Sequence, residues 1–169
     1  AHYVWSHPEL CPEADESALP QLAASRDYWR ARLPSLPPAP ELAPMQVILD
    51  IDKPVFERVD AAVAQADWTR ITQTCRTERV TVASFLLANY TRVLARWADT
   101  DHFCVNVTLF DRDPGVPGIE DVVGDFTSLL LLECHVDASL SVWEQARRLQ
   151  RQLITDLPHR AADAVWLQR

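Results

Sequence analysis

Hydrophobic residues in this chain recur mainly at the three- and four-residue spacing of amphipathic helices. The clearest case is the segment 81–98, where Thr81 stands ahead of the apolar stripe as a helix cap. A second helix is predicted to begin at Ser141, because Ser141 and Glu144 have the spacing of a capping box. The apolar side of this second helix comprises Val142, Ala146, Leu149 and Leu153.

Two weaker helical patterns and a stiff connection are predicted in the first half of the chain, after an opening loop over residues 1–20. The segment 22–33 is rich in helix formers and ends at Pro34, and 66–79 has a moderate helical pattern. The segment 34–44 contains five prolines, which favour extended backbone and exclude both a helix and an inner strand. This proline-rich crossover is the best candidate for a boundary between two lobes.

Strand patterns follow the helix predicted over 81–98. From Phe103 to Phe110 apolar and polar residues alternate, so a strand would place Asn106 and Thr108 on the face opposite the valines. The segment 124–136 holds a continuous apolar run, which suits a strand covered on both faces and therefore implies flanking helices. The segment 55–63 is a third, weaker candidate strand. These elements predict an α/β fold.

Composition narrows the class of protein. The 169 residues are 48% hydrophobic and 24% charged, which suffices for one sizeable core. The formal net charge of −8 disfavours nucleic-acid binding. No apolar run approaches the length of a membrane span and no signal peptide is visible, so a cytoplasmic location is expected. The basic stripe of the helix after Ser141, formed by Arg147, Arg148 and Arg151, is expected to be a solvated face.

Cysteine and histidine chemistry is weakly indicated. The four cysteines, at positions 11, 75, 104 and 134, form no CxxC pair, so no metal site is expected. They are interpreted as small reduced apolar residues.

His159 and Asp163 have HxxxD spacing, which would place both side chains on one face of a helix. Neither a second histidine nor a following glycine accompanies them, and a structural role is favoured for His159. Of these chemistry-bearing residues, Cys11, Cys75, Cys104 and Cys134 are therefore all interpreted as structural as well.

A polar set remains within the two strand-like segments. Polar groups that are buried must be hydrogen-bonded, so these side chains are either structural fasteners or residues of a site, and pattern alone favours fasteners. The set comprises Asn106, Thr108, Asp125, Thr127 and Ser128.

Several segments together resemble heterocyclization domains of nonribosomal peptide synthetases. DYWRARLPSLPPAPEL at 27–42 resembles the family's LPxxPxLPL motif, and TVASFLLANYTRVLARW at 81–97 resembles its helix ending in LxxW. FCVNVTLFDR at 103–112 resembles the strand FTLNLTLFNR. GDFTSLLLL at 124–132 matches the GDFTxLxLL motif without a gap, where ordinary condensation domains carry a GxFVNTLPLR type of sequence. RLQRQLITDLPH at 148–159 is similar to the family's helix with its DLDH ending.

The resemblance implies part of a chloramphenicol-acetyltransferase-like fold, in which two α/β lobes enclose a tunnel. Residues 1–44 would supply a loop, a short helix and the crossover, and residues 45–169 part of the C-terminal lobe. Such a domain joins a carrier-bound acyl group to Cys, Ser or Thr and then closes that residue to a thiazoline or oxazoline. It has no cofactor of its own, because its substrates are tethered to phosphopantetheine on upstream and downstream carrier domains.

The resemblance also assigns roles and sets limits. Asn106 corresponds to the family's functional asparagine, while Asp125, Thr127 and Ser128 belong to the motif that shapes the site. The family's DxxxxD, PVVFTS and QTPQVxLD motifs are missing, so the 169-residue chain alone is expected to be inactive and to self-associate through exposed apolar surface. A non-catalytic docking or scaffold module for carrier proteins is the alternative, and an acyltransferase that uses His159 is a weaker one.

Overall fold

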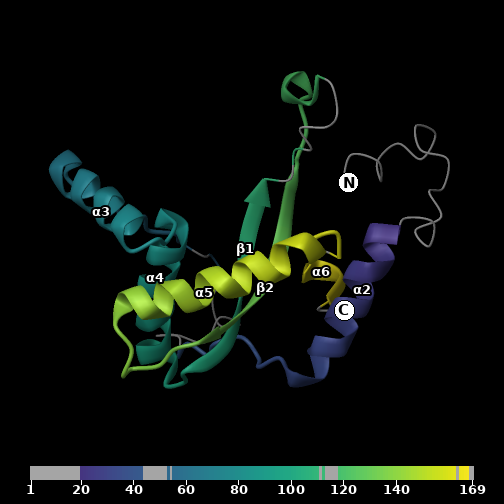
Figure 1. The fold of residues 1–169 in the computed structure, drawn as a ribbon, viewed down its shortest axis with the longest axis horizontal. Coiled ribbons are helices and arrows are strands. Elements are labelled where there is room, and N and C mark those ends of the chain that lie inside the picture. The colour runs from purple at the N-terminus through teal and green to yellow at the C-terminus, as the bar shows by residue number, and fades with distance from the viewer. Residues whose placement is uncertain are drawn as a thin grey trace. The chain divides into compact units, whose positions relative to one another are not determined.

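The computed structural model describes residues 20–43, 53, 55–110, 112, 118–162 and 164–167, without the side chains of Gln21, Val165 and Trp166. It contains both helices and a pair of strands, so the predicted α/β class is confirmed (Figure 1). The elements are α2 (Pro20–Arg32), η3 (Leu33–Ser35), α3 (Gln65–Thr77), α4 (Val82–Ala98), β1 (His102–Phe110), η5 (Ile119–Asp121), β2 (Thr127–His135), α5 (Val142–Asp156), η6 (Leu157–His159) and α6 (Ala164–Leu167).

The four predicted helices form close to their expected bounds. The end of the first differs, since Pro34 lies within the short 3-10 helix η3 instead of ending the helical path. A proline is tolerated in the first turn of a helix, because its fixed φ suits that turn and its missing N–H would have no partner there. Residues 36–43 are neither helix nor strand, as the proline-rich pattern predicts.

Local side-chain contacts explain where α4 and α5 begin. The Thr81 hydroxyl accepts the backbone N–H of Ser84 at 3.1 Å, which confirms the predicted cap of α4. At α5, Glu144 accepts the backbone N–H of Ser141 at 2.9 Å, and the Ser141 hydroxyl accepts the backbone N–H of Glu144 at 3.3 Å. These reciprocal bonds are the predicted capping box. α4 ends at Asp99, whose φ of 49° turns the chain out of the helix.

β1 and β2 pair side by side, and the connection at their far end carries η5 (Figure 1). The backbone N–H of Val136 donates to the carbonyl of Asp101 at 2.7 Å, just beyond one end of the pair. Because both strands have nine residues, this bond indicates an antiparallel register that runs to the opposite ends. Asn106 then lies opposite Leu131, and Phe110 lies opposite Thr127.

The burial of the strands matches the patterns that predicted them. Along β1, Val105, Val107 and Leu109 are half-buried, whereas Asn106 and Thr108 between them are exposed. Three successive leucines of β2 are buried on both faces, as expected for a strand with cover on each side. These leucines are Leu130, Leu131 and Leu132.

The strand predicted over 55–63 is wrong in this structure. These residues form no regular element, and Phe56 and Val59 are more than 90% exposed. A strand requires a hydrogen-bonded neighbour, and no described segment pairs with this one.

The chain divides into two compact units. Unit 1 comprises residues 1–37, 104–133 and 152–169, and unit 2 comprises residues 38–103 and 134–151. The core of unit 1 consists of Trp29, Cys104, Leu130, Leu131, Ala162, Ala164 and Leu167. Buried side chains of unit 2 include Cys75, Val80, Ala88, Phe103, Val136, Ala146 and Leu149.

Two sequence expectations lie outside the described residues. The opening loop predicted for 1–20 falls almost wholly there, as does most of the segment DPGVPG at 113–118, whose prolines and glycines favour a turn between the strands. At the edge of that turn, Gly118 has a φ of 76°, a left-handed conformation that glycine adopts without steric cost. Separately, none of the described helices combines the length and hydropathy that crossing a membrane requires.

Candidate functional site

Asn106 is exposed on one face of β1, at the middle of the strand. In the antiparallel register Thr127 shares that face, four residues further along the hairpin, which corresponds to roughly 13 Å. Asn106 and Thr108 are exposed, and Thr127 is half-buried. Neither β1 residue is buried, and Leu131, which lies opposite Asn106 in this register, is buried beside it.

Asp125 and Ser128 occupy different surroundings at the start of β2. Asp125 is exposed, and its Oδ1 accepts the backbone N–H of Thr127 at 2.8 Å, so the carboxylate orders the entry to the strand. Ser128 points to the opposite face from Thr127. Its Oγ is buried and has no hydrogen-bond partner among the described residues. The hairpin thus brings Asn106 and Thr127 to one face and directs Ser128 to the other.

Arg112 was missed by sequence reasoning and contacts this region directly. Its Nη1 donates to the carbonyl of Val122 at 3.0 Å and to the carbonyl of Ile119. The guanidinium carbon lies 4.2 Å from the centre of the Phe126 ring, within the range of a cation–π contact. The arginine after the polar strand and the phenylalanine of the GDFT motif were visible in the sequence, but nothing there showed that they meet.

His159 is held as a packing residue in η6. Its ring stacks on Tyr28 with centroids 3.8 Å apart and planes 9° from parallel, and its carbonyl accepts the Trp29 indole N–H at 3.0 Å. Asp163, the partner of the HxxxD spacing, lies outside the described residues. These contacts favour the structural role over the acyltransferase alternative.

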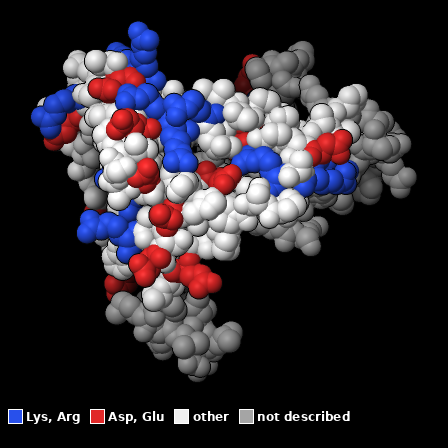
Figure 2. Space-filling model, turned by 60° about the horizontal axis from the view of Figure 1, so that its bottom comes forward, with Lys and Arg blue, Asp and Glu red and all other residues white. Residues whose placement is uncertain are grey.

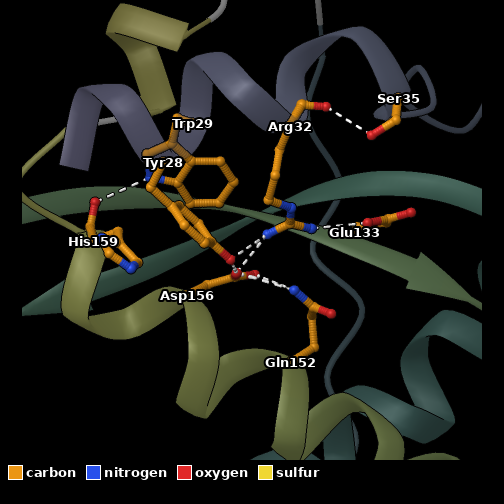
Figure 3. Close-up of polar contacts among 8 residues, drawn as sticks. All are labelled: Tyr28, Trp29, Arg32, Ser35, Glu133, Gln152, Asp156 and His159. Carbon is orange, nitrogen blue, oxygen red and sulfur yellow. Dashed lines mark hydrogen bonds and ion pairs between the residues drawn. The ribbon is translucent and has the colours of Figure 1, made fainter. Parts of the chain in front are cut away.

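A buried ionic network connects α2, β2 and α5 within unit 1 (Figure 3). Arg32 pairs with Asp156 at 2.5 Å and with Glu133 at 2.8 Å. Asp156, which is fully buried, also accepts from the Tyr28 hydroxyl and from Gln152. Burial and the bond to the Asp156 carboxylate raise the pKa of the Tyr28 phenol above its usual value. All parts of this network have partners, so its geometry is that of a structural fastener.

The described cysteines are buried and free, as interpreted from the sequence. Burial raises the pKa of the Cys104 thiol to about 11, and it also raises the pKa of Cys75. A thiol with a raised pKa carries little thiolate at neutral pH and is a poor nucleophile. Cys134 is buried as well, and Cys11 lies outside the described residues.

The basic stripe of α5 is less solvated than expected. Arg147 pairs with Glu78 at 2.8 Å, with both side chains little more than one-third exposed, and Arg148 bonds to the His135 ring at 3.0 Å. These residues therefore join α5 to its neighbours in unit 2. On the face drawn in Figure 2, basic and acidic side chains lie interspersed and do not form a patch of one sign.

The comparisons with known proteins agree with this architecture. The family model named condensation domain matches residues 13–169. The pyochelin synthetase PchE of Pseudomonas aeruginosa is 37% identical over 147 residues, which cover 87% of this chain and 10% of that protein. The phenyloxazoline synthase MbtB of Mycobacterium tuberculosis is 34% identical over 165 residues, 94% of this chain and 11% of that protein.

A solved structure shows the same fold. The cyclization-docking bidomain of EpoB from Sorangium cellulosum superposes with a TM-score of 0.77 at 30% identity, over 85% of this chain and 29% of that chain. The chain therefore belongs to the condensation domain family of the nonribosomal peptide synthetases, and it has part of that family's α/β fold. Within the family, it is similar to synthetases whose names include oxazoline formation and cyclization. The chain spans about a tenth of the length of PchE and MbtB.

Proposed function

We propose that this chain is part of a heterocyclization domain, which forms an amide and then closes it to a thiazoline or oxazoline. The observation that carries the proposal is the placement of Asn106 and the GDFT residue Thr127 on one face of a hairpin. Likeness to the EpoB cyclization-docking bidomain supports it. The substrates would be tethered to phosphopantetheine on upstream and downstream carrier domains in the cytoplasm.

The first reaction is acyl transfer between two carrier-bound groups. The amine of a tethered Cys, Ser or Thr attacks the carbonyl carbon of the acyl thioester, so that a C–N bond forms and a C–S bond breaks. The upstream phosphopantetheine leaves as its thiol, and the amine proton passes to a base. The product is a linear amide on the downstream carrier.

The second reaction closes the ring and releases water. The side-chain sulfur or oxygen attacks the new amide carbonyl carbon, the former carbonyl oxygen takes up two protons and leaves as water, and a C=N bond forms. This step requires a donor to the carbonyl oxygen, a base for the attacking group and an acid for the departing oxygen.

Asn106 suits the part of carbonyl donor. Its amide can donate a hydrogen bond without ionising, and its exposed position leaves room for a substrate above β1. Thr127 and Asp125 would shape the site further along the same hairpin. Because Asn106 and Thr127 are roughly 13 Å apart along the strands, they would contact different parts of one extended tethered substrate.

The test is a product assay on the synthetase that contains this chain, loaded with an acyl donor and with Cys, Ser or Thr on its carriers. We expect a tethered product whose mass is that of the amide less one water. A synthetase that accumulates only the linear amide would contradict the ring-closing step. One that binds both carriers and forms neither product would instead support the non-catalytic docking module.

A further inference from the structure

Arg112, two residues after the end of β1, contacts the segment that leads into β2. Its Nη1 donates to the carbonyl of Val122 at 3.0 Å and to the carbonyl of Ile119, so one nitrogen joins two backbone oxygens three residues apart. The same guanidinium lies 4.2 Å from the centre of the Phe126 ring. One exposed side chain therefore contacts this segment at three points, all within unit 1.

Several contacts within this segment are local turns. The backbone N–H of Asp121 donates to Gly118, that of Val122 donates to Ile119 at 3.3 Å, and that of Thr127 donates to Asp125. Bonds between residues two or three apart shape a turn, but they do not fix it against another element. Arg112 adds contacts of longer range, because it lies two residues after the end of β1 and bonds to carbonyls seven and ten residues further along the chain.

The position of Phe126 makes this attachment relevant to the site. Phe126 stands between Asp125 and Thr127, and neighbouring side chains of extended backbone point to opposite sides. Holding the Phe126 ring against Arg112 therefore restrains the backbone that carries Asp125 and leads into Thr127 at the start of β2. Loss of this contact would leave Asp125 and the start of β2 freer to move relative to Asn106.

Arginine has the geometry that this task requires. Its planar guanidinium presents N–H donors in the plane, for the two carbonyls, and a cationic face for the aromatic ring. A lysine ammonium is a compact point charge that lacks this plane and fork. Arg112 is exposed, so the attachment contributes little to burial and its loss should leave the fold intact.

We propose that Arg112 is a positioning residue of the ring-closing site: through the carbonyls of Ile119 and Val122 and the ring of Phe126, it holds Asp125 and the start of β2 in place relative to Asn106. This inference rests on the proposed function for its kinetic consequence. Arg112 does not itself touch the substrate in this assignment, so its effect appears in the rate and not in substrate binding.

The kinetic test compares variants of the synthetase that contains this chain. Arg112→Gln should lower kcat for ring formation about 10- to 100-fold, the scale of a site displaced by about 1 Å, and change KM less than about threefold. Phe126→Leu should have a similar effect, and the double variant should be little worse than either single one. Arg112→Lys should not restore the rate, whereas Phe126→Tyr, which keeps an aromatic face, should.

The matched control is Arg70→Gln. Arg70 is an exposed arginine that pairs with Asp67 three residues earlier on α3, and its variant should keep the wild-type rate. The inference is overturned if Arg112→Gln keeps the wild-type kcat, if its loss only follows a loss of folded protein, or if the two single effects multiply in the double variant. Full rescue by Arg112→Lys would show that charge alone is required and would also overturn it.

A structural readout separates this inference from the proposed function. Amide hydrogen exchange of residues 119–127 should be faster in Arg112→Gln than in the wild type, while exchange in α4 and α5 should stay unchanged. Equal exchange in the two proteins overturns the inference even if the activity falls. A wild-type synthetase that forms no ring overturns the proposed function, and the exchange measurement then still decides whether Arg112 orders the segment.

Discussion

At the scale of single residues, the two candidates for acyl-transfer chemistry differ in their surroundings. Asn106 is exposed on β1, while His159, the other candidate for acyl-transfer chemistry, has its ring stacked on Tyr28. Strand alternation and family resemblance indicated Asn106, whereas His159 was a candidate through its HxxxD spacing with Asp163. The exposure of Asn106 and the stacking of the His159 ring favour Asn106 as the residue that meets a substrate.

Replacing Asn106 with alanine in the synthetase should therefore affect turnover more than folding. We expect product formation to fall on the order of tenfold to a thousandfold, as when one positioned donor to a developing oxyanion is lost. The melting temperature should change little, because Asn106 is exposed. The measurements are the rate of ring formation and a thermal unfolding curve for the same preparation.

Two controls make this result specific. Thr108→Ala removes a neighbouring exposed side chain from the same face of β1 and should leave turnover within a few-fold of wild type. His159→Ala should leave turnover nearly intact. A well-folded Asn106→Ala variant with full activity would refute the assignment, and a collapse of turnover in well-folded His159→Ala would favour the histidine mechanism.

At the scale of elements, α5 begins where the sequence placed it because its signal is local. Ser141 and Glu144 are three residues apart and satisfy each other's backbone N–H groups without help from the rest of the chain. The hydroxyl and backbone bonds from Ser141 lower the pKa of the Glu144 carboxyl below its usual 4.5. A lowered pKa in the folded state means that the ionised carboxylate stabilises the fold.

This stabilisation should have a defined pH dependence. It is fully present above the unfolded-state pKa near 4.5 and is lost as the pH falls through the lower folded-state pKa. Glu144→Gln keeps an acceptor but removes the charge, so its free energy of unfolding should lie below that of wild type at pH 7. The difference should shrink as the pH falls below about 4.5, in urea titrations at a series of pH values.

Ser141→Ala provides the matching control for this capping contribution. It removes the hydroxyl that bonds to Glu144 at 2.7 Å and should reduce the same pH-dependent difference. Combining both substitutions should add little to either one, because the two residues act as a unit. A difference between wild type and Glu144→Gln that stays constant down to low pH would exclude this explanation.

At the scale of the whole molecule, contacts between distant segments define unit 1. The Arg32 guanidinium joins α2 to Asp156, 124 residues later, and to Glu133 on β2. The Asp156 side chain is fully buried and that of Arg32 is 18% exposed. In such a poorly solvated environment, a charge without an ionic partner destabilises the folded state. The proline-rich segment that follows α2 was predicted to be a lobe boundary, and that assignment for a complete domain stays a prediction.

Removing one member of this network should destabilise unit 1 strongly. Arg32→Met keeps most of the apolar stem but leaves the Asp156 carboxylate buried with only neutral partners, Tyr28 and Gln152. We expect a loss of about 3–5 kcal/mol in the free energy of unfolding, the usual result of breaking a buried ion pair. Urea unfolding followed by tryptophan fluorescence would measure it, since Trp29 is fully buried in the same unit.

The control lies on the same helix. Arg30 forms an exposed pair with Asp27 at 3.4 Å, with side chains 62% and 77% exposed, so Arg30→Met should change stability by less than about 1 kcal/mol. If both variants lost the same small amount, the network would not be the fastener of unit 1.

The sequence by itself determined the features that depend on neighbours a few residues apart. The Thr81 cap, the Ser141 and Glu144 box and the alternation around Asn106 are short-range patterns, and each appears in the structure where it was predicted. Hydrophobic periodicity and short polar contacts act within one element, so they can be recognised in one sequence. The run GDFTSLLLL likewise indicated the family to which the chain belongs.

Only the tertiary structure decided which distant residues meet and which strand candidates find a partner. The strand predicted over 55–63 has no hydrogen-bonded neighbour among the described residues, and Arg112 meets Phe126, 14 residues later, across the connection between β1 and β2. Arg32 likewise meets Asp156 only because α2 and α5 are brought together. Pairing and burial are properties of the folded chain, and no local pattern encodes the partner that a side chain or strand edge will have.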